Sequence, residues 1–252
     1  MRTNRSTGTW KELGALIGFA AILCITFVAG FAFAVFQNTN GARKEMLFAD
    51  YGELGQYRAA NLALPPDPNR VIFLGDSITY LWNLEASFPG ENNLNRGING
   101  QTTSQMLVRF RQDVLDLQPA TVVILAGTND LGETSAAPTP IPDIERNLQT
   151  MAELTVAHHI RPVFASLLPV NNYTSKAPIS GLRSPQSLVA INDWLKAYCG
   201  RNGYTYLDYH SAMVSANGLM RRDLSDDGLH PNAAGYQIMA SITKSALKQK
   251  PQ

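Results

Sequence analysis

The first residues whose arrangement could do chemistry follow a short apolar run at 71–74, where the chain continues as Gly75-Asp76-Ser77. Such a run, closed by a glycine, predicts a buried strand that places Ser77 at its carboxyl end, where a helix begins. A serine there is exposed at the sheet edge, and a helix N-terminus favours a nearby alkoxide or oxyanion. The alternative is that Asp76 or Ser77 is an ordinary N-cap of that helix.

A histidine and two acids lie close together near the other end of the chain, in the segment 226–232 with the sequence DDGLHPN. Asp227 precedes His230 by three residues, so one turn holds a carboxylate and an imidazole. The chain order Ser77, Asp227, His230 permits a nucleophile, an orienting carboxylate and a general base, provided that the fold brings Ser77 beside His230. Asp227 would then hold the imidazole in the tautomer that accepts the serine proton.

Two glycine-containing turns follow the next two predicted strands, at 95–102 (NRGINGQT) and 126–130 (AGTND). A glycine lets the backbone approach a ligand closely, and an asparagine amide can donate a hydrogen bond to an oxyanion. Taken singly, each turn is more typical of a plain connection between a strand and a helix.

The elements that would position these residues alternate between short apolar runs and segments of helical period. The predicted strands are 71–74, 93–95, 121–125, 162–167 and 204–207. Ser184 and Asn232 are expected to cap the last two helices. Two further helices have apolar faces made by Leu107, Phe110, Val114 and Leu117, and by Ile141, Ile144, Leu148 and Met151. The pattern predicts an α/β fold with a parallel sheet, covered by helices on both faces, and a site at the carboxyl ends of the strands.

Residues 13–36 contain no charged residue and are almost entirely apolar. As a helix they would reach about 36 Å, enough to cross a bilayer core of roughly 30 Å. We therefore expect residues 1–36 to hold a hydrophobic signal anchor. The basic residues before it mildly favour a catalytic part outside the cytoplasm, in the cell envelope. The alternatives are a signal peptide cleaved after Ala32-Phe33-Ala34, which would leave a secreted or periplasmic protein, and a buried soluble helix.

The rest of the chain divides into a connecting part at 37–69 and one domain at 70–252. The connecting part is expected to hold a linker and a helix that ends at Pro65-Pro66. The side chains available to dock that helix are Met46, Leu54, Tyr57 and Leu62.

The part of the chain after residue 42 is almost neutral. Setting aside the three basic residues and one acidic residue of the first 42 leaves 18 basic and 19 acidic residues. A balance of this kind excludes a basic footprint for nucleic acid. Cys199 is the single cysteine in that part, so an intramolecular disulfide is excluded there.

Taken together, the blocks 75–77, 95–100, 127–130 and 227–231 resemble those of one family, the SGNH hydrolases, also called GDSL esterases and lipases. The resemblance covers about residues 70 to 240. It implies a three-layer α/β/α sandwich with a five-stranded parallel sheet, similar to flavodoxin. It also implies a carboxylic ester hydrolase in which protein groups do all the chemistry, with no cofactor and no metal.

Residue by residue, the resemblance makes Ser77 the nucleophile, His230 the base and Asp227 its partner. The oxyanion donors would be the backbone N–H groups of Ser77 and Gly100 and the side-chain amide of Asn129. Gly100 resembles the family's donor more closely than Gly97 does, because that donor directly precedes an acidic or amide residue and a threonine.

Other residues are candidates for the surroundings of the triad or for the lining of a substrate pocket. Trp82, together with Tyr80, would either line an acyl or aryl pocket or pack under the first helix. Gln101 stands where members of the family often have an acid, a departure that leaves the triad itself untouched. Asp76, Asn99 and Asp130 are the other candidates beside Trp82.

Two other functions use the same residues differently. A metal-dependent phosphoesterase would take its ligands from Asp76, Asp130, Asp227 and His230. A membrane-tethered binding domain would keep the fold without turnover. Within the esterase interpretation, short-chain acyl esters are expected. An acetylated carbohydrate and a lysophospholipid are the alternative substrates, and neither composition nor the family decides among them.

Overall fold

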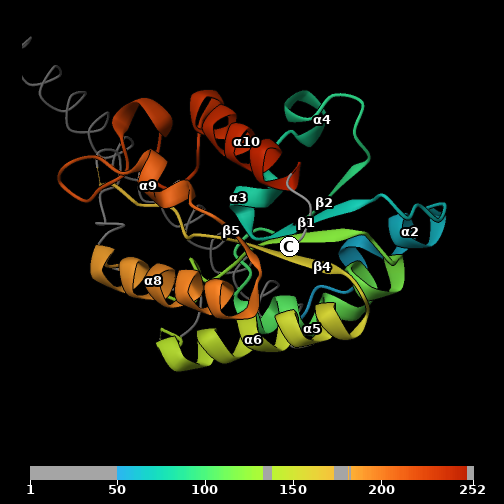
Figure 1. Ribbon diagram of the computed structural model, residues 1–252. Helices are drawn as coiled ribbons and strands as arrows, with labels where there is room; N and C mark the ends of the chain where they lie inside the picture. Colours follow the sequence, from blue (N-terminus) through green and yellow to red (C-terminus); the bar gives the residue numbers. More distant parts are fainter. Residues whose placement is uncertain (1–49, 133–137, 173–180, 182, 249–252) are drawn as a thin grey trace, which may run out of the picture. The chain divides into compact units, whose positions relative to one another are not determined.

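Five short segments of the chain pair as parallel strands into one sheet in the computed structural model (Figure 1). The strands lie in the order β2-β1-β3-β4-β5, which is the flavodoxin-like order. The expected α/β fold with a five-stranded parallel sheet is therefore confirmed. The strands are β1 (Val71–Gly75), β2 (Asn93–Gly97), β3 (Thr121–Leu125), β4 (Arg161–Ala165) and β5 (Thr205–Leu207).

The structure describes residues 50–132, 138–172, 181 and 183–248. The chain divides into two units, Met1–Tyr51 and Gly52–Gln252, and the sheet belongs to the second. The hydrophobic helix expected within residues 1–36 lies outside the described residues. The helices that the structure does describe include none that is long and apolar enough to span a bilayer.

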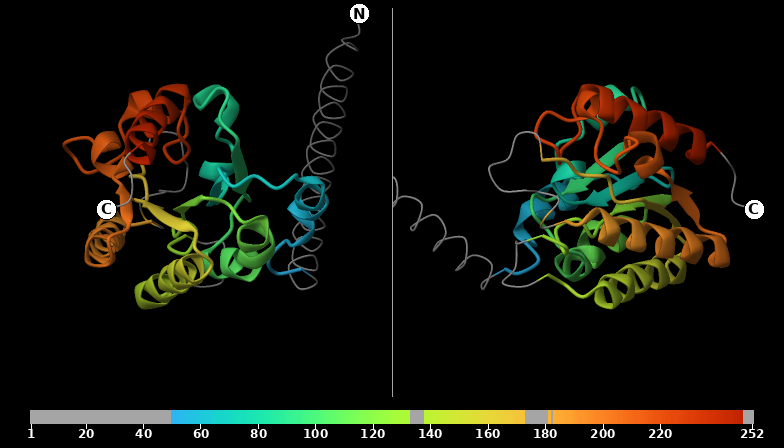
Figure 2. Two further views of the ribbon diagram at one scale, coloured as in Figure 1. Left: turned by 45° about the vertical axis from the view of Figure 1, so that its right-hand side comes forward. Right: turned by 90° about the vertical axis from the view of Figure 1, so that its left-hand side faces the viewer.

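Helices cover both faces of the sheet, and Figure 2 shows the two layers on either side of it. Successive side chains of a strand point to opposite faces. Ile72 and Leu74 therefore pack with the side chains of α5, α6 and α8, whereas Phe73 packs with those of α3, α9 and α10. The helices are α2 (Gly55–Ala63), α3 (Ser77–Tyr80), α4 (Leu84–Ser87), α5 (Thr103–Asp113), α6 (Ile141–Ala157), α8 (Pro185–Asn202), α9 (Tyr209–Met213) and α10 (Ala233–Leu247), with 3-10 turns η1 (Leu115–Leu117) and η2 (Arg222–Leu224).

Side-chain caps begin the helices where the sequence predicts them. The Ser184 hydroxyl accepts from the N–H of Ser187 at 3.0 Å, directly before α8. The Asn232 side chain accepts from two N–H groups in the first turn of α10. Both caps satisfy N–H groups that have no partner within their own helix.

The fourth strand ends earlier than its apolar run. The apolar run predicts a strand to residue 167, but β4 ends at Ala165. Beyond it, the Leu167 N–H donates to the Asn192 side chain, and the Asn192 amide donates back to the Leu167 carbonyl. The Asn192 side chain, on α8, thus makes the two hydrogen bonds that a neighbouring strand would otherwise make. The apolar pattern alone does not reveal this exchange.

The helix before the domain, α2, is held mainly by polar contacts. It has no buried residue, and Leu62, which the sequence offered for docking, is 84% exposed. Instead, the Tyr57 hydroxyl donates to the Gly97 carbonyl. The Asn61 side chain accepts from Arg96 at 2.6 and 3.0 Å and donates to Asp113 at 2.7 Å. The expectation of apolar docking through Leu62 was wrong. The helix is held instead by the hydrogen bonds of Asn61 to Arg96 and Asp113, two charged side chains that require polar partners.

Candidate active site

Ser77 is the first residue of α3, and Asp76 alone separates it from the end of β1. The Asp76 carboxylate accepts from the Ile78 N–H at 2.9 Å and so caps the helix, while Ser77 is left half-buried at the sheet edge. The turn is tight, since a Cβ atom at Gly75 would overlap the Thr79 hydroxyl and approach the Leu125 carbonyl to 2.8 Å. Asp76 is therefore the residue that caps α3, and the Ser77 hydroxyl does not take part in this cap.

The Ser77 hydroxyl meets the imidazole of His230 across 153 positions of sequence. The Ser77 Oγ lies 2.9 Å from the His230 Nε2, and the His230 Nδ1 lies 2.6 Å from an Asp227 carboxylate oxygen. With Nδ1 donating to the carboxylate, Nε2 is the nitrogen that can accept the serine proton. The structure therefore brings together the three residues in the geometry that a nucleophile, a base and an orienting acid require.

The Asp227 carboxylate is anchored by its own loop. Its other oxygen accepts from the N–H groups of Leu229 and His230, both at 2.8 Å. Desolvation favours the neutral acid, but the bonds from the His230 side chain and these N–H groups outweigh it and lower the pKa of Asp227. The residue therefore stays ionised in the range where it must orient the imidazole.

The loop before His230 rests on the segment that follows β4. The Asn171 N–H donates to the Gly228 carbonyl at 2.7 Å. Gly228 has a φ of 89°, and a Cβ atom there would overlap the Asn171 carbonyl oxygen. The glycine is required both by the left-handed backbone and by the close approach.

Asn129 follows β3 and is almost completely buried. Its side-chain Nδ2 lies 3.1 Å from the Gln101 carbonyl and 3.3 Å from an Asp76 carboxylate oxygen. These contacts join the loop after β3 to the loops after β1 and β2. The amide therefore lies where the three loops converge beside Ser77.

Gly97 is the last residue of β2, and Gly100 lies in the loop that follows it. The Gly97 N–H donates to the Asn95 side chain at 2.8 Å, and a Cβ atom at Gly97 would overlap the backbone of Tyr80. Gly97 is thus a packing residue whose donor is already used. Gly100, with a φ of 75°, directly precedes the Gln101 carbonyl that contacts Asn129.

Asp76 is buried between these loops, with 1% of its surface exposed. Desolvation raises the pKa of this carboxyl to about 6, although the Ile78 N–H, His230 and Arg183 favour its charged form. Its carboxyl joins the nucleophile turn to Asn129, so its protonation state bears on the geometry of the site.

The remaining sequence candidates have different surroundings. Asp130 is fully buried and accepts from the N–H and hydroxyl of Thr103, at 2.9 and 2.6 Å, which ties the loop after β3 to the start of α5. Burial raises the pKa of Asp130, and the bonds from Thr103 oppose the rise. Asn99 is exposed. Trp82 is buried against Phe73 and Tyr236, so its ring supports α3 from within the core.

Two buried arginines support the site and were not singled out by the sequence analysis. The Arg109 side chain donates to the Gln101 side chain at 2.5 Å, to the Gly75 carbonyl at 3.1 Å and to Asp113 at 3.0 Å. Its only sequence signal is its place on the inward face of α5, one turn after Met106. Arg183 donates to the loop after β3, and nothing in its local sequence marks it.

The acids and histidine that could have formed a metal site are held in other bonds. Asp130 is bound by Thr103, and Asp227 is bound by His230. Within the described ranges there is no group of three or more His, Cys, Asp or Glu side chains that could hold a metal ion.

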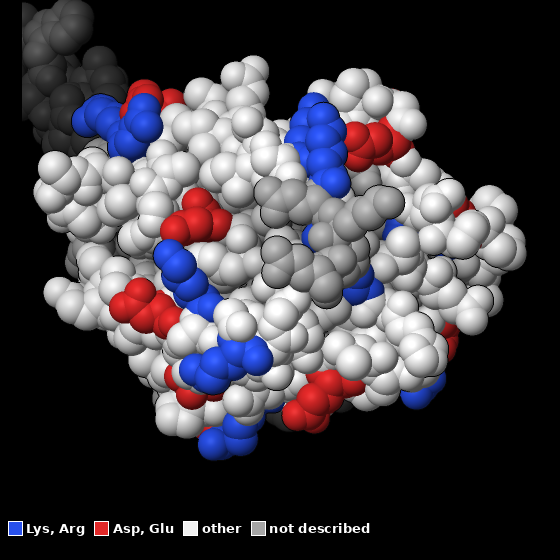
Figure 3. All heavy atoms as spheres, viewed as in Figure 1, with Lys and Arg blue, Asp and Glu red and all other residues white. Residues whose placement is uncertain are grey.

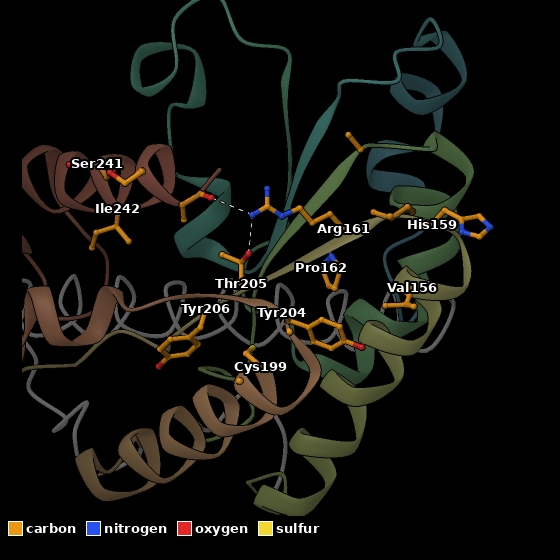
Figure 4. A pocket seen from close by; sticks show the side chains of 16 residues that line it. Val156, His159, Arg161, Pro162, Cys199, Tyr204, Thr205, Tyr206, Ser241 and Ile242 are labelled. Atoms are coloured by element: carbon orange, nitrogen blue, oxygen red, sulfur yellow. Dashed lines mark hydrogen bonds between the residues drawn. The ribbon is translucent and has the colours of Figure 1, made fainter. Parts of the chain in front are cut away.

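A hollow of about 1140 Å³ lies at the opposite end of the sheet, next to the start of β4. Figure 4 shows its lining, which includes Arg161, Cys199 and Tyr204. Because the strands are parallel, this amino end is the far edge from Ser77.

On the face drawn in Figure 3, basic and acidic side chains are interspersed, in keeping with the balanced charge of the sequence.

The model of the GDSL-like Lipase/Acylhydrolase family matches residues 73–238, which include Ser77, Asn129 and His230. The chain belongs to this family. It is therefore an SGNH hydrolase, as the sequence blocks indicate, and membership implies hydrolase or esterase activity.

A solved structure with a similar fold is that of a candidate acylhydrolase from Bacteroides fragilis. It is 38% identical, with a TM-score of 0.73, and the match covers 79% of this chain and 97% of that one.

Two curated relatives match shorter parts of this GDSL-family chain. The uncharacterized lipoprotein YqeF of Bacillus subtilis is 34% identical over 31% of this chain, and the isoamyl acetate-hydrolyzing esterase of Saccharomyces cerevisiae is 23% identical over 58%. The chain spans only 32% and 64% of the lengths of these two proteins.

Proposed function

We propose that the protein is a serine esterase that cleaves carboxylic esters through an acyl-enzyme on Ser77. The observation that carries the proposal is the pair of contacts at His230, whose Nε2 lies 2.9 Å from the Ser77 Oγ and whose Nδ1 lies 2.6 Å from Asp227. These contacts supply a hydroxyl, a base and an oriented tautomer in one place.

In the first half of the reaction, His230 Nε2 takes the proton of the Ser77 hydroxyl while Oγ attacks the ester carbonyl carbon. The resulting oxyanion accepts hydrogen bonds from the N–H groups of Ser77 and Gly100 and from the Asn129 amide. The Asn129 Nδ2 atom lies 3.3 Å from Asp76 and 3.1 Å from the Gln101 carbonyl, and the longer bond, to Asp76, is the one that the oxyanion replaces. Collapse of the tetrahedral intermediate transfers the proton from His230 to the departing alcohol.

In the second half, a water molecule attacks the acyl-enzyme carbonyl and His230 accepts its proton. The second intermediate collapses, the proton passes back to the Ser77 oxygen, and the carboxylic acid leaves. Asp227 keeps its charge throughout and stabilises the imidazolium that forms twice in the cycle. Every proton in the cycle is held by a group of this chain, its substrate or water.

The proposed substrates are esters with a short acyl group. The yeast relative is an isoamyl acetate-hydrolyzing esterase, and isoamyl acetate carries an acetyl group. An acetylated carbohydrate and a lysophospholipid are the alternatives within the same chemistry, and the length of acyl chain accepted separates the lipid from the other two.

We also propose that the domain acts in the cell envelope, outside the cytoplasm, held at the membrane by residues 13–36. The length and the lack of charge in that segment support this placement. A cleaved signal in the same residues would leave the domain free outside the cytoplasm instead.

The test is hydrolysis of p-nitrophenyl esters from acetate to palmitate by the full chain in detergent, with Ser77→Ala prepared identically. Activity on the acetate that the Ser77→Ala protein lacks, together with an acyl adduct on Ser77 in intact mass, is expected. Equal rates in both proteins would show that Ser77 is not the nucleophile. Activity that a chelator removes and a divalent cation restores would favour metal-dependent chemistry in place of the serine mechanism, and p-nitrophenyl phosphate would then be the next substrate.

A further inference from the structure

The guanidinium of Arg183 binds the turn that carries Asn129. Its Nε donates to the Thr128 carbonyl at 3.0 Å and its Nη2 donates to the Asn129 side-chain oxygen at 3.2 Å. Arg183 is 8% exposed and fits closely, because a Cβ atom at Gly132 would lie 2.6 Å from its Nη2. A fork of two donors therefore binds one backbone and one side-chain oxygen of neighbouring residues.

This contact determines which end of the Asn129 amide faces the site. An amide has an oxygen end and a nitrogen end of almost the same shape, so only its partners set the orientation. Arg183 can only donate, and it therefore holds the oxygen end. The nitrogen end is left facing Asp76 and the Gln101 carbonyl, on the side of the Ser77 and Gly100 loops.

The charge on Arg183 also changes the strength of the amide as a donor. A cation that donates to the amide oxygen draws electron density from the nitrogen, so the amide N–H becomes a stronger donor. Burial lowers the pKa of Arg183, and the Asp76 carboxylate nearby opposes that shift. A guanidinium remains protonated under these conditions, so the polarising charge is permanent.

We infer that Arg183 is a positioning residue for catalysis: it orients and polarises the Asn129 amide so that its nitrogen donates to the oxyanion. The inference rests on the proposed function, in which Asn129 is an oxyanion donor. It predicts that the effect of Arg183 on catalysis passes mainly through Asn129, and that this effect lies in kcat rather than in KM.

The experiment is a double-mutant cycle on kcat for p-nitrophenyl acetate, measured in the full chain in detergent, with Arg183→Met, Asn129→Ala and the pair. Asn129→Ala is expected to lower kcat roughly 10²- to 10³-fold, and Arg183→Met to lower it roughly 10- to 100-fold with KM within about twofold. In the Asn129→Ala background, Arg183→Met should change kcat by less than about twofold, because the amide through which it acts is gone.

Arg161→Met is the matched control, because Arg161 also donates to a hydroxyl and a backbone carbonyl, those of Thr205 and Ala246, at the far end of the sheet (Figure 4). It should lower the melting temperature while leaving kcat unchanged. Arg183→Lys provides a second cycle if the methionine variant does not fold, because lysine keeps the charge but loses the fork of two donors.

The outcomes separate the two claims. If Asn129→Ala leaves kcat unchanged, the oxyanion role of Asn129 in the proposed function is wrong. If Asn129→Ala lowers kcat but Arg183→Met lowers it by the same factor in both backgrounds, Asn129 keeps its role and the inference about Arg183 is overturned. An unchanged kcat in Arg183→Met alone also overturns it.

Discussion

At the scale of single residues, the site depends on polar groups whose charge is controlled by burial. Asp76 is the clearest case, because it is buried beside Asn129 and its pKa is raised to about 6 by desolvation. Asp227, which contacts His230, has its pKa lowered instead by hydrogen bonds from the imidazole and the backbone. Two carboxyls of one site thus differ in the pH at which they lose their proton.

The raised pKa of Asp76 predicts a pH dependence of stability. The folded protein holds this proton to a higher pH than the unfolded chain, so the stability that it contributes is complete below about pH 4 and is lost as the pH rises to about 6. The shift from 3.8 to about 6 corresponds to roughly 3 kcal/mol. Asp76→Asn cannot ionise and escapes this loss.

Thermal melts of the wild type and Asp76→Asn at pH 4, 5, 6 and 7 check this. The difference in melting temperature should move in favour of Asp76→Asn as the pH rises. The comparison uses the slope and not the absolute stability, because the new amide also changes the contact with Asn129. A difference that stays constant over this range would show that Asp76 titrates normally in the folded protein.

At the scale of elements, the loops of the site form hydrogen bonds with other parts of the chain. The loop of His230 rests on Asn171, and the loop of Asn129 is tied to α5 through Asp130 and Thr103. Each loop therefore owes its shape to a partner from another part of the chain. Substitutions at these contacts should therefore affect catalysis although they change no residue of the triad.

Gly228→Ala is expected to impair both stability and turnover. An alanine must adopt a φ of 89° and would also overlap the Asn171 carbonyl, so the loop that carries Asp227 and His230 has to move. Gly218→Ala is the matched control, with a φ of 79° and nothing within 4 Å of the added Cβ atom.

Both alanine variants should lose about 1 kcal/mol through the left-handed backbone. Only Gly228→Ala should lose more and also show a reduced kcat, measured with p-nitrophenyl acetate beside a denaturant titration. Equal losses of stability and equal kcat in the two variants would mean that the contact with Asn171 does not shape the site.

The polar docking of α2 gives a second prediction at this scale. Asn61→Ala leaves Arg96 and Asp113 without their shared partner, and a buried polar group that loses its bond typically costs about 1 to 3 kcal/mol. Leu62→Ala, on the same helix but 84% exposed, should be nearly neutral. Urea unfolding of the two variants measures this, and a larger loss in Leu62→Ala would contradict the polar docking of α2.

At the scale of the whole molecule, the parallel sheet places all of this chemistry at one edge. The carboxyl ends of β1, β2 and β3 are level, since Gly75 pairs with Gly97 on one side and with Leu125 on the other. The loops that follow these strands therefore begin together. The distant His230 enters the same edge through the loop before α10.

The proposed anchoring predicts where the full chain is found in a cell that produces it. We expect it in the membrane fraction after a high-salt wash, with an intact mass equal to that of the whole chain. A deletion of residues 13–36 should release the protein into the soluble fraction with the same esterase activity. A shortened mass that begins after Ala34 would instead establish a cleaved signal.

The sequence by itself determined what is local. Asp227 and His230 share one turn, the caps Ser184 and Asn232 act within a few residues, and the apolar runs define the strands and hence the edge where Ser77 lies. Such features depend on spacing along the chain, which can be read directly. The order of the blocks then indicated the family, and with it the fold.

The tertiary structure alone decided which distant groups satisfy one another. The hydrogen bond from Arg183 to Asn129 joins positions 54 residues apart, and the polar docking of α2 joins Asn61 to Asp113. No local pattern marks these pairs, because a buried polar group requires a partner but does not specify where along the chain that partner lies. The reason is physical: burial creates the need for each bond, and only the folded chain determines which group is near enough to meet it.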